Sequence, residues 1–286
     1  MASPYFDQVR ELVSRLKGPS VSPESLPTDK DIPRIAKTLA LIPRAASDGD
    51  VVVDVGARTF WAPIYAEILG YRRIVFVWRP GMEEEKIWWS MPGVEVQTVC
   101  CDAELDEYPI SSESVTQVCV FEVLEHLAGD PMHMLAEINR ILKPDGRICL
   151  STPNVLWREN ALRFLFGGHP FAWSPYTCTY ADRHNHEFTP HEVQALLHAA
   201  GMDAEYLGTH DKEQAAGKSL LRRGAEWMIC LPAAVLGRVP LGLRNRETVI
   251  RAVRRSGLRQ RYPQDFYTMY GRSSVSLPST LTRAGR

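Results

Sequence analysis

Short apolar segments alternate with segments of helical periodicity through most of this chain, and this alternation is the strongest constraint on its fold. The segment VVVDV at 51–55 is apolar apart from one acid, as expected of a strand buried on both faces. Further strands are predicted at 73–78, 94–100, 115–121 and 147–153. Strands that alternate with helices form a parallel sheet. The sequence therefore predicts an α/β fold: a Rossmann-like, doubly wound sheet with helices on both faces.

Helices and two further strands are predicted from the same periodicity. The expected helices cover residues 5–17, 33–42, 60–69, 83–89, 131–142 and 190–201. The segment MDAEYLGT (202–209) predicts a sixth strand, and DFYTMYGRSS (265–274) a last one. We expect an N-terminal helical cap at 1–47, a core at 48–212 with an aromatic and histidine-rich insert at 155–188, and a C-terminal extension at 213–286 that completes the fold.

Charge is spread unevenly along the chain. The formal net charge is -1, yet from residue 213 onwards Lys and Arg outnumber Asp and Glu by about 14 to 4. Two interpretations of this basic extension remain open. It packs on the acidic body of the protein, or it binds an anionic partner such as a lipid headgroup, a phosphorylated substrate or nucleic acid.

Composition excludes several classes of protein. Hydrophobic residues make up 45% of the chain and charged residues 23%, which excludes a wholly disordered chain, and the net charge of -1 excludes a uniformly basic nucleic-acid binder. The sequence contains no run of about 18 apolar residues, so no transmembrane segment is predicted. The N-terminus lacks the apolar run of a signal peptide. The six cysteines form no CxxC pair, so we expect reduced thiols in a cytoplasmic protein.

Two long motifs carry a family resemblance. The first is EVLEHLAGDPMHMLAEINRILKPDGRICLSTPN, which begins at Glu122, and the second is FTPHEVQALLHAAGM, which begins at Phe188. Together with the strand order, they make residues 48–210 resemble the class I S-adenosylmethionine-dependent methyltransferases. The resemblance implies the seven-stranded sheet of that family and S-adenosylmethionine as the cofactor.

The glycine-rich turn of that family is only partly present. In the family, the first strand ends in an acid, and glycines then let the backbone approach the cofactor. Asp54 and Gly56 match this pattern, whereas Arg58 and Phe60 stand where two further glycines are usual.

The other cofactor positions are also mixed. The second strand usually ends in an acid that binds the ribose hydroxyls, but here Trp78 stands at that position and Arg79 follows it. Asp102 matches the acid that lies beside the adenine amine. The resemblance thus implies the following cofactor-binding set: Asp54, Gly56, Trp78, Asp102 and Glu122.

Three interpretations of this altered pocket remain open. The protein binds S-adenosylmethionine with another residue replacing the lost carboxylate. Alternatively, it keeps the fold without binding the cofactor and serves as a regulatory or scaffold partner. In the third interpretation, Arg58 or Arg79 adapts the pocket to a more anionic ligand, because a guanidinium binds carboxylate or phosphate well.

Histidines in the insert are the candidate catalytic residues. Histidine is the side chain best suited to accept a proton near neutral pH, and methyl transfer to a hydroxyl benefits from a base. His184 and His186 directly precede the FTP helix start, so either is expected to be the base. Several aromatic residues of the insert suit a sugar, glycan or natural product as acceptor. We therefore expect O-methylation of a small hydroxylated acceptor.

A metal-dependent alternative is also open. Glu122, Glu125, His126 and His186 resemble the ligand set of the small-RNA 3′-terminal 2′-O-methyltransferases, where two carboxylates and two histidines hold a divalent ion. Many family members carry VLEHL without a metal, so we expect no metal ligand among the site residues.

Overall fold

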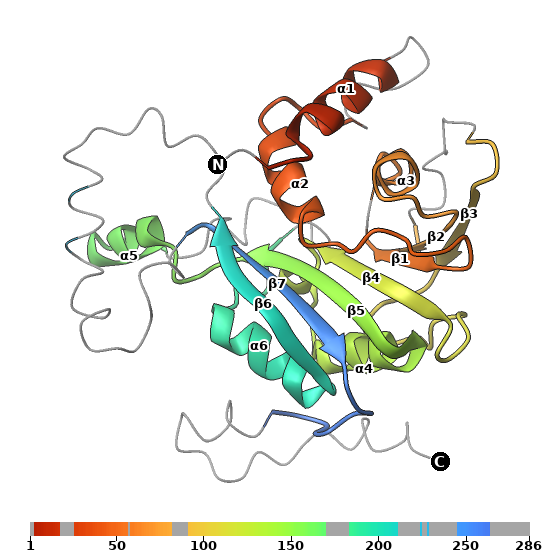
Figure 1. Cartoon of the computed structure of the whole chain (residues 1–286). Coiled ribbons are helices and arrows are strands. Elements are labelled where there is room, and N and C mark those ends of the chain that lie inside the picture. Colours follow the sequence, from red (N-terminus) through yellow and green to blue (C-terminus); the bar gives the residue numbers. More distant parts are fainter. Residues whose placement is uncertain are drawn as a thin grey trace.

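A seven-stranded sheet forms the centre of the protein, in the order β3-β2-β1-β4-β5-β7-β6 (Figure 1). This computed structural model describes residues 3–17, 26–56, 58–81, 91–169, 183–210 and 245–263, together with 224 and 228. The strands are β1 (Val51–Val55), β2 (Arg73–Trp78), β3 (Glu95–Cys100), β4 (Val115–Phe121), β5 (Leu142–Pro153), β6 (Met202–His210) and β7 (Glu247–Arg254). The helices are α1 (Phe6–Leu16), α2 (Ile32–Leu39), α3 (Trp61–Pro63), the π-helical η2 (Ile64–Ile68), the 3₁₀-helical η3 (Leu124–His126), α4 (Met132–Ile141), α5 (Arg158–Leu165) and α6 (Pro190–Ala199).

Strands β1 to β5 are parallel, and β7 runs antiparallel to both of its neighbours, β5 and β6. The carboxyl ends of β1, β2, β3, β4 and β5 therefore meet at one edge of the sheet. This is the edge at which open α/β sheets bind their ligands. The α/β, Rossmann-like fold expected from the alternation of strands and helices is confirmed.

Helices cover both faces of the sheet, as Figure 1 shows. On one face, α4 and α6 close a core that contains Val53, Val55 and Ile138. On the other face, α1, α2, α3 and η2 close a second core that contains Val52 and Phe76. Because side chains alternate along a strand, β1 sends Val53 and Val55 to one core and Val52 to the other. Each core is continuous, which gives the carboxyl edge a rigid base.

Strand β7 adds to the strands expected from the sequence. The strand expected at 265–274 and the helix expected at 83–89 lie outside the described residues. Strand β7, which the sequence pattern did not indicate, forms from ETVIRAVR and inserts between β5 and β6. The basic residues of this segment obscure its apolar strand pattern in the sequence. Val249, Ile250 and Val253 are nevertheless fully or almost fully buried. The C-terminal extension thus supplies a strand that lies inside the sheet rather than at its edge.

Several arginines of the basic extension pair with acids of the body. Arg254 lies 2.9 Å from Glu113, and Arg251 lies 3.0 Å from Glu205. Arg255 pairs with Asp145, and Arg259 with Asp203. These pairs are partly exposed, so each contributes little to stability. They show that part of the basic charge faces the acidic body, as the first interpretation of the extension requires.

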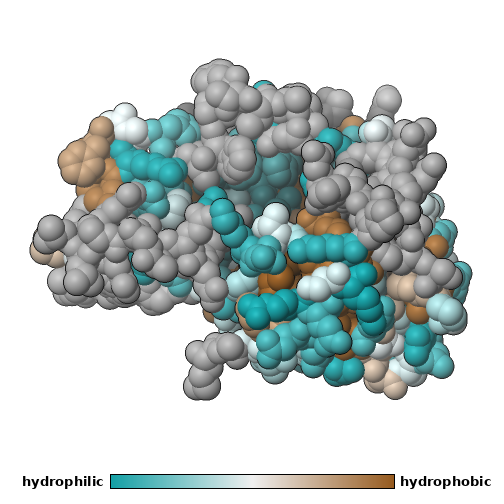
Figure 2. Space-filling model, turned by 90° about the horizontal axis from the view of Figure 1, so that it is seen from above, coloured by the Kyte–Doolittle hydropathy of each residue, from teal (hydrophilic) through white to brown (hydrophobic). Residues whose placement is uncertain are grey.

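Among the side chains that Figure 2 colours by hydropathy, hydrophilic ones predominate, with apolar ones showing between them near the centre. An apolar group of side chains stands at the left of that view, on the side where Figure 1 places α5. Three consecutive residues at the end of this helix are widely exposed: Phe164, Leu165 and Phe166. Among the described helices, none combines the length and the hydropathy needed to cross a membrane.

Candidate functional site

The turn after β1 opens the site at the carboxyl edge. Gly56 is exposed and has a φ of +78°, which a residue with a side chain rarely adopts. A Cβ at this position would lie 2.6 Å from Cγ2 of Val123, which follows β4. Glycine is therefore required here by backbone conformation and by close packing. The same packing holds the turn against the segment that follows β4.

The two positions where further glycines are usual differ from each other. Arg58 is exposed, whereas the Phe60 ring is buried and stacks on Trp61 with ring centroids 5.5 Å apart. Trp61 in turn lies 5.1 Å from the ring of Phe121, at the end of β4. An aromatic stack thus supports the turn where related proteins have glycine. It makes the turn rigid and apolar on its inner side.

Asp54 lies beneath this turn and not on the open surface. Its side chain is fully buried, and the Tyr65 hydroxyl donates a hydrogen bond to its Oδ2. Its Oδ1 accepts no hydrogen bond from the described part of the chain. Burial raises the pKa of Asp54 well above its usual value, and the Tyr65 hydrogen bond opposes this shift only in part. The residue therefore supports the turn from inside, with a carboxyl group that favours the neutral form.

Replacing Asp54 with Asn removes this titration, and the result depends on pH. Because the folded-state pKa of Asp54 is raised, its contribution to stability is complete below its unfolded pKa of about 4 and is lost as pH rises through the folded value. The amide oxygen of Asn still accepts from Tyr65. We therefore expect the free energy of unfolding of D54N, relative to the native protein, to increase from pH 4 upwards in urea denaturation series. A difference that is constant with pH would contradict this account.

The position of the missing ribose carboxylate is apolar. Trp78 is 2% exposed and stacks beside Phe76, with ring centroids 6.1 Å apart. Asp102, by contrast, is only partly buried, and its Oδ1 accepts a hydrogen bond of 2.8 Å from the Glu104 backbone N–H. A ligand at this edge can therefore reach the Asp102 carboxylate but not the carboxyl of Asp54.

Glu122 follows β4 in a strained conformation. Its φ is +56°, in the left-handed region that residues with a side chain seldom occupy. The Ser151 hydroxyl donates a hydrogen bond of 3.0 Å to its Oε1, and its own N–H donates to the Ser151 carbonyl, also at 3.0 Å. The side chain is partly exposed. The two hydrogen bonds to Ser151 hold this strained residue, and its carboxylate, at the carboxyl edge beside the turn that contains Gly56.

A buried polar cluster lies directly behind Glu122. Glu125 is 1% exposed, and its Oε2 accepts a hydrogen bond of 2.9 Å from the Thr152 hydroxyl. Its Oε1 lies 3.8 Å from Nε2 of His126. Burial, followed by the neighbouring charge of Glu122, raises the pKa of Glu125 well above its usual value.

His184 completes this cluster from a distant part of the sequence. Its ring lies edge-on to that of His126, with centroids 5.0 Å apart. Its Nδ1 lies 2.9 Å from Oε1 of the buried Glu187. Ligand atoms of Glu125, His126 and His184 all lie within 4.8 Å of one another. We name these three residues the EHH cluster.

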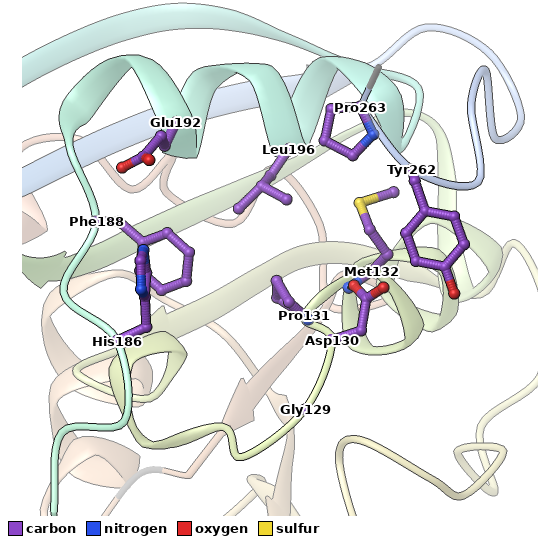
Figure 3. Close-up of a pocket in the computed structure, with 10 residues that line it drawn as sticks. All are labelled: Gly129, Asp130, Pro131, Met132, His186, Phe188, Glu192, Leu196, Tyr262 and Pro263. Atoms are coloured by element: carbon purple, nitrogen blue, oxygen red, sulfur yellow. The ribbon is translucent and has the colours of Figure 1, made fainter. Parts of the chain in front are cut away.

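His186 points elsewhere, although it is only two residues from His184. It is exposed, and its ring lies edge-on to Phe188 at 4.4 Å. His186 and Phe188 line a pocket of about 360 Å³ between the starts of α4 and α6 (Figure 3). Asp130, Met132, Glu192, Leu196 and Tyr262 also face this pocket. His186 is therefore not part of the EHH cluster, and the four-residue ligand set considered from the sequence is not assembled as such.

Sequence reasoning missed two supporting residues of this site. Glu187 orients His184, and Thr152 bonds Glu125, yet neither was singled out from the sequence. The sequence does contain a signal for Glu187, because it stands three residues after His184. An acid at this spacing in a short segment can reach the histidine ring. Thr152 carried no such signal, since its partner Glu125 lies in η3, 27 residues away in the sequence.

Structural comparison finds chains with a similar fold. One belongs to the complex between the Haloferax volcanii Trm112 methyltransferase activator and a methyltransferase, with a TM-score of 0.51, 18% identity, and coverage of 77% of this chain and 88% of that one. A second is an S-adenosylmethionine-dependent methyltransferase from Mesorhizobium loti, with a TM-score of 0.50, 13% identity, and coverage of 79% and 98%. At these identities the likeness concerns the fold alone. No curated protein matches the sequence.

A family model described as a methyltransferase domain matches residues 31–207. This match spans more than half of the chain, and it includes β1 through most of β6 with the Gly56 turn, Glu122 and the EHH cluster. The family resemblance inferred from the two sequence motifs is thereby confirmed: the chain belongs to the methyltransferase domain family.

Proposed function

We propose that this protein transfers a methyl group from S-adenosylmethionine to a hydroxyl group of a small acceptor. The observation that carries the proposal is the carboxyl edge of the sheet. At this edge, the exposed Gly56 turn is accompanied by two carboxylates that a ligand can reach, those of Asp102 and Glu122. The chain also belongs to the methyltransferase domain family. When bound, S-adenosylmethionine supplies an electrophilic methyl on a cationic sulfonium.

The residues of the edge fit a cationic cofactor. The Asp102 carboxylate can accept a hydrogen bond from an adenine amine, and the Glu122 carboxylate lies beside the turn and suits a cation. Asp54, whose Oδ1 is buried without a hydrogen bond from the described residues, supports the turn from below. The ribose contact is altered, because Trp78 offers no carboxylate. Of the three interpretations of this pocket, we favour cofactor binding with a changed ribose contact.

The pocket beside His186 suits the acceptor. Its volume of about 360 Å³ lies in the range of small-molecule sites, and the aromatic residues Phe188 and Tyr262 are among those that line it, which suits a sugar or a planar natural product. His186 is exposed in this pocket and can accept the hydroxyl proton, whereas His184 is buried with its Nδ1 bonded to Glu187. We therefore assign the role of base to His186, and catalysis rests mainly on positioning the acceptor.

Cofactor binding is tested by calorimetric titration of the native protein with S-adenosylmethionine and S-adenosylhomocysteine. We expect micromolar binding of both. The variant E122G should weaken binding about ten- to a hundredfold, because a hydrogen bond to a charged group is worth about 1.5–3 kcal/mol. The control E113G replaces another glutamate with positive φ, at the opposite edge of the sheet, and should bind like the native protein. Absence of binding by the folded native protein would overturn the proposal.

A non-catalytic role is the second candidate, and one observation favours it. Phe60 and Trp78 are buried aromatic residues at two positions where the family usually has glycine and an acid. The chain would then keep the fold and act as a regulatory or scaffold partner. One structural neighbour comes from a complex with a methyltransferase activator, which makes protein partners a sensible class to test. The same titration decides between the two candidates.

A further inference from the structure

We propose that the EHH cluster binds one divalent transition-metal ion through Glu125, His126 and His184. The positions of these side chains support this site independently of the proposed methyl transfer. A carboxylate oxygen with two imidazole nitrogens is a ligand set for Zn²⁺, Mn²⁺, Fe²⁺ or Co²⁺, and not for Ca²⁺, which takes oxygen ligands.

Hydrogen bonds fix which nitrogen each ring offers. Nδ1 of His126 lies 3.1 Å from the Arg183 carbonyl, and Nδ1 of His184 lies 2.9 Å from the Glu187 carboxylate. A carbonyl only accepts, and so does a carboxylate, so both Nδ1 atoms carry the proton. In the neutral rings the lone pair is then on Nε2. Metal-binding histidines in proteins are held in this way, by an acceptor on the nitrogen that does not face the ion.

Backbone hydrogen bonds hold the two segments of the site together. The N–H groups of Asn185 and His186 donate to the Glu125 carbonyl at 2.7 and 3.3 Å. The Asn185 side chain donates to the His126 carbonyl at 2.8 Å. These contacts join η3 to the segment before α6, which is almost 60 residues away in the sequence. The geometry of the EHH cluster is therefore built into the fold.

The buried carboxylate provides an independent observation that points to a ligand. Glu125 is 1% exposed, and its Oε1 accepts no hydrogen bond within the part of the chain described. An unsatisfied buried oxygen is costly unless a cation or a donor approaches it. Glu122 and Glu247 add negative charge nearby. A divalent cation between Glu125 and the two rings would compensate this charge.

Only a small contraction is needed to form the site. Ligand atoms of a tetrahedral zinc ion lie about 3.3 Å apart, given metal–ligand distances of about 2.0–2.2 Å. The ligand atoms of the cluster lie within 4.8 Å of one another, and Glu125 Oε1 and His126 Nε2 are 3.8 Å apart. Binding therefore requires these atoms to move closer together by about 1.5 Å at most. Three protein ligands then leave one position for water or a ligand oxygen.

The experiment measures metal binding without cofactor or acceptor. Full-length protein is stripped with a chelator, and Zn²⁺ and Mn²⁺ are titrated by calorimetry, with metal content checked by elemental analysis. We expect one ion per chain. The variant H184Q should lower the affinity by more than a hundredfold, and E187Q by about ten- to a hundredfold, as expected of a residue that orients a ligand. The control H186Q should bind like the native protein.

Cobalt provides a second readout, which is spectroscopic. Co²⁺ bound by two imidazoles and a carboxylate in a four-coordinate site gives visible absorption bands, and these should survive in H186Q and vanish in H184Q. The absence of a Co²⁺ spectrum and of stoichiometric Zn²⁺ binding in the native protein would overturn the proposal. So would equal loss of binding in H184Q and H186Q. Failure of methyl transfer with metal binding intact would count against the proposed function alone.

Discussion

Replacing His186 with Gln is expected to lower the rate constant for methyl transfer by about 10²–10⁴, the usual contribution of a general base. Glutamine has a similar size and keeps a polar group in the pocket, but it cannot accept the hydroxyl proton. The affinity for S-adenosylmethionine should not change, because His186 lines the pocket between α4 and α6 and not the Gly56 turn. Single-turnover kinetics with the acceptor, together with calorimetry, separates the two quantities.

A matched control comes from α6. His191 is exposed on this helix and lines no described pocket, so H191Q should have native kinetics. Equal rates for H186Q and the native protein would show that the hydroxyl is activated by another group. Equal losses in H186Q and H191Q would show that the effect comes from the helix start and not from the base.

The variant G201A is expected to lower the free energy of unfolding by about 3 kcal/mol or more. Gly201 has a φ of +86°, and a Cβ there would lie 2.5 Å from the Ser256 carbonyl oxygen and 2.9 Å from Nδ2 of Asn139. It would also contact the Gly257 carbonyl. Left-handed backbone costs a residue with a side chain about 1–2 kcal/mol, and overpacking against backbone adds about 1–3 kcal/mol. Chemical denaturation measures the loss.

The tight packing at Gly201 has an identifiable purpose. Asn139, on α4, donates hydrogen bonds to the carbonyls of Ala200 and Ser256 at 2.7 and 2.9 Å. These bonds tie α4 to the end of α6 and to the turn after β7. The control G93A has a similar φ of +74° but nothing within 4 Å of its Cβ. We therefore expect its free energy of unfolding to fall by only about 1 kcal/mol, the cost of the left-handed backbone. Equal losses in the two variants would contradict this explanation.

Much of the fold could be predicted because its signals are local. The apolar runs at 51–55, 73–78 and 115–121 coincide with β1, β2 and β4. The helix expected at 190–201 is Pro190–Ala199, with a capping box between Thr189 and Glu192. A fully buried parallel strand shows in the sequence as an uninterrupted apolar run, so it needs no knowledge of its partners.

Other elements depend on long-range contacts. Strand β7 contains Glu247, Arg251 and Arg254, whose charges are compensated by distant residues, among them Arg34, Glu205 and Glu113. The helix expected at 60–69 is a single α-helical turn followed by a π-helical segment. Trp61 and Tyr65 stack here, with ring centroids 5.5 Å apart. Neither feature can be inferred from periodicity alone.

The candidate site was predictable in its residue types but not in its assembly. His184 and His186 are equivalent from the sequence, yet one is 6% exposed within the EHH cluster and the other is exposed in a pocket. Regular alternation along an extended segment would place residues two apart on the same side, so the sequence alone does not separate them. Only the contacts of His184 with Glu125 and His126, and of His186 with Phe188, distinguish the two. Whether they act as ligand and base stays a prediction.

The insertion of β7 between β5 and β6 has a consequence for biosynthesis. Strands β5 and β6 are complete once residue 210 has been made. In the part of the chain that the structure describes, β5 pairs with β4 and β7, whereas β6 pairs with β7 alone. Until residues 247–254 emerge from the ribosome, the nascent chain carries an open edge on β5, and β6 has no place in the sheet. At about 5–20 residues per second, this state lasts for seconds. Messages truncated before codon 254 would thus yield products that chaperones and proteases recognise.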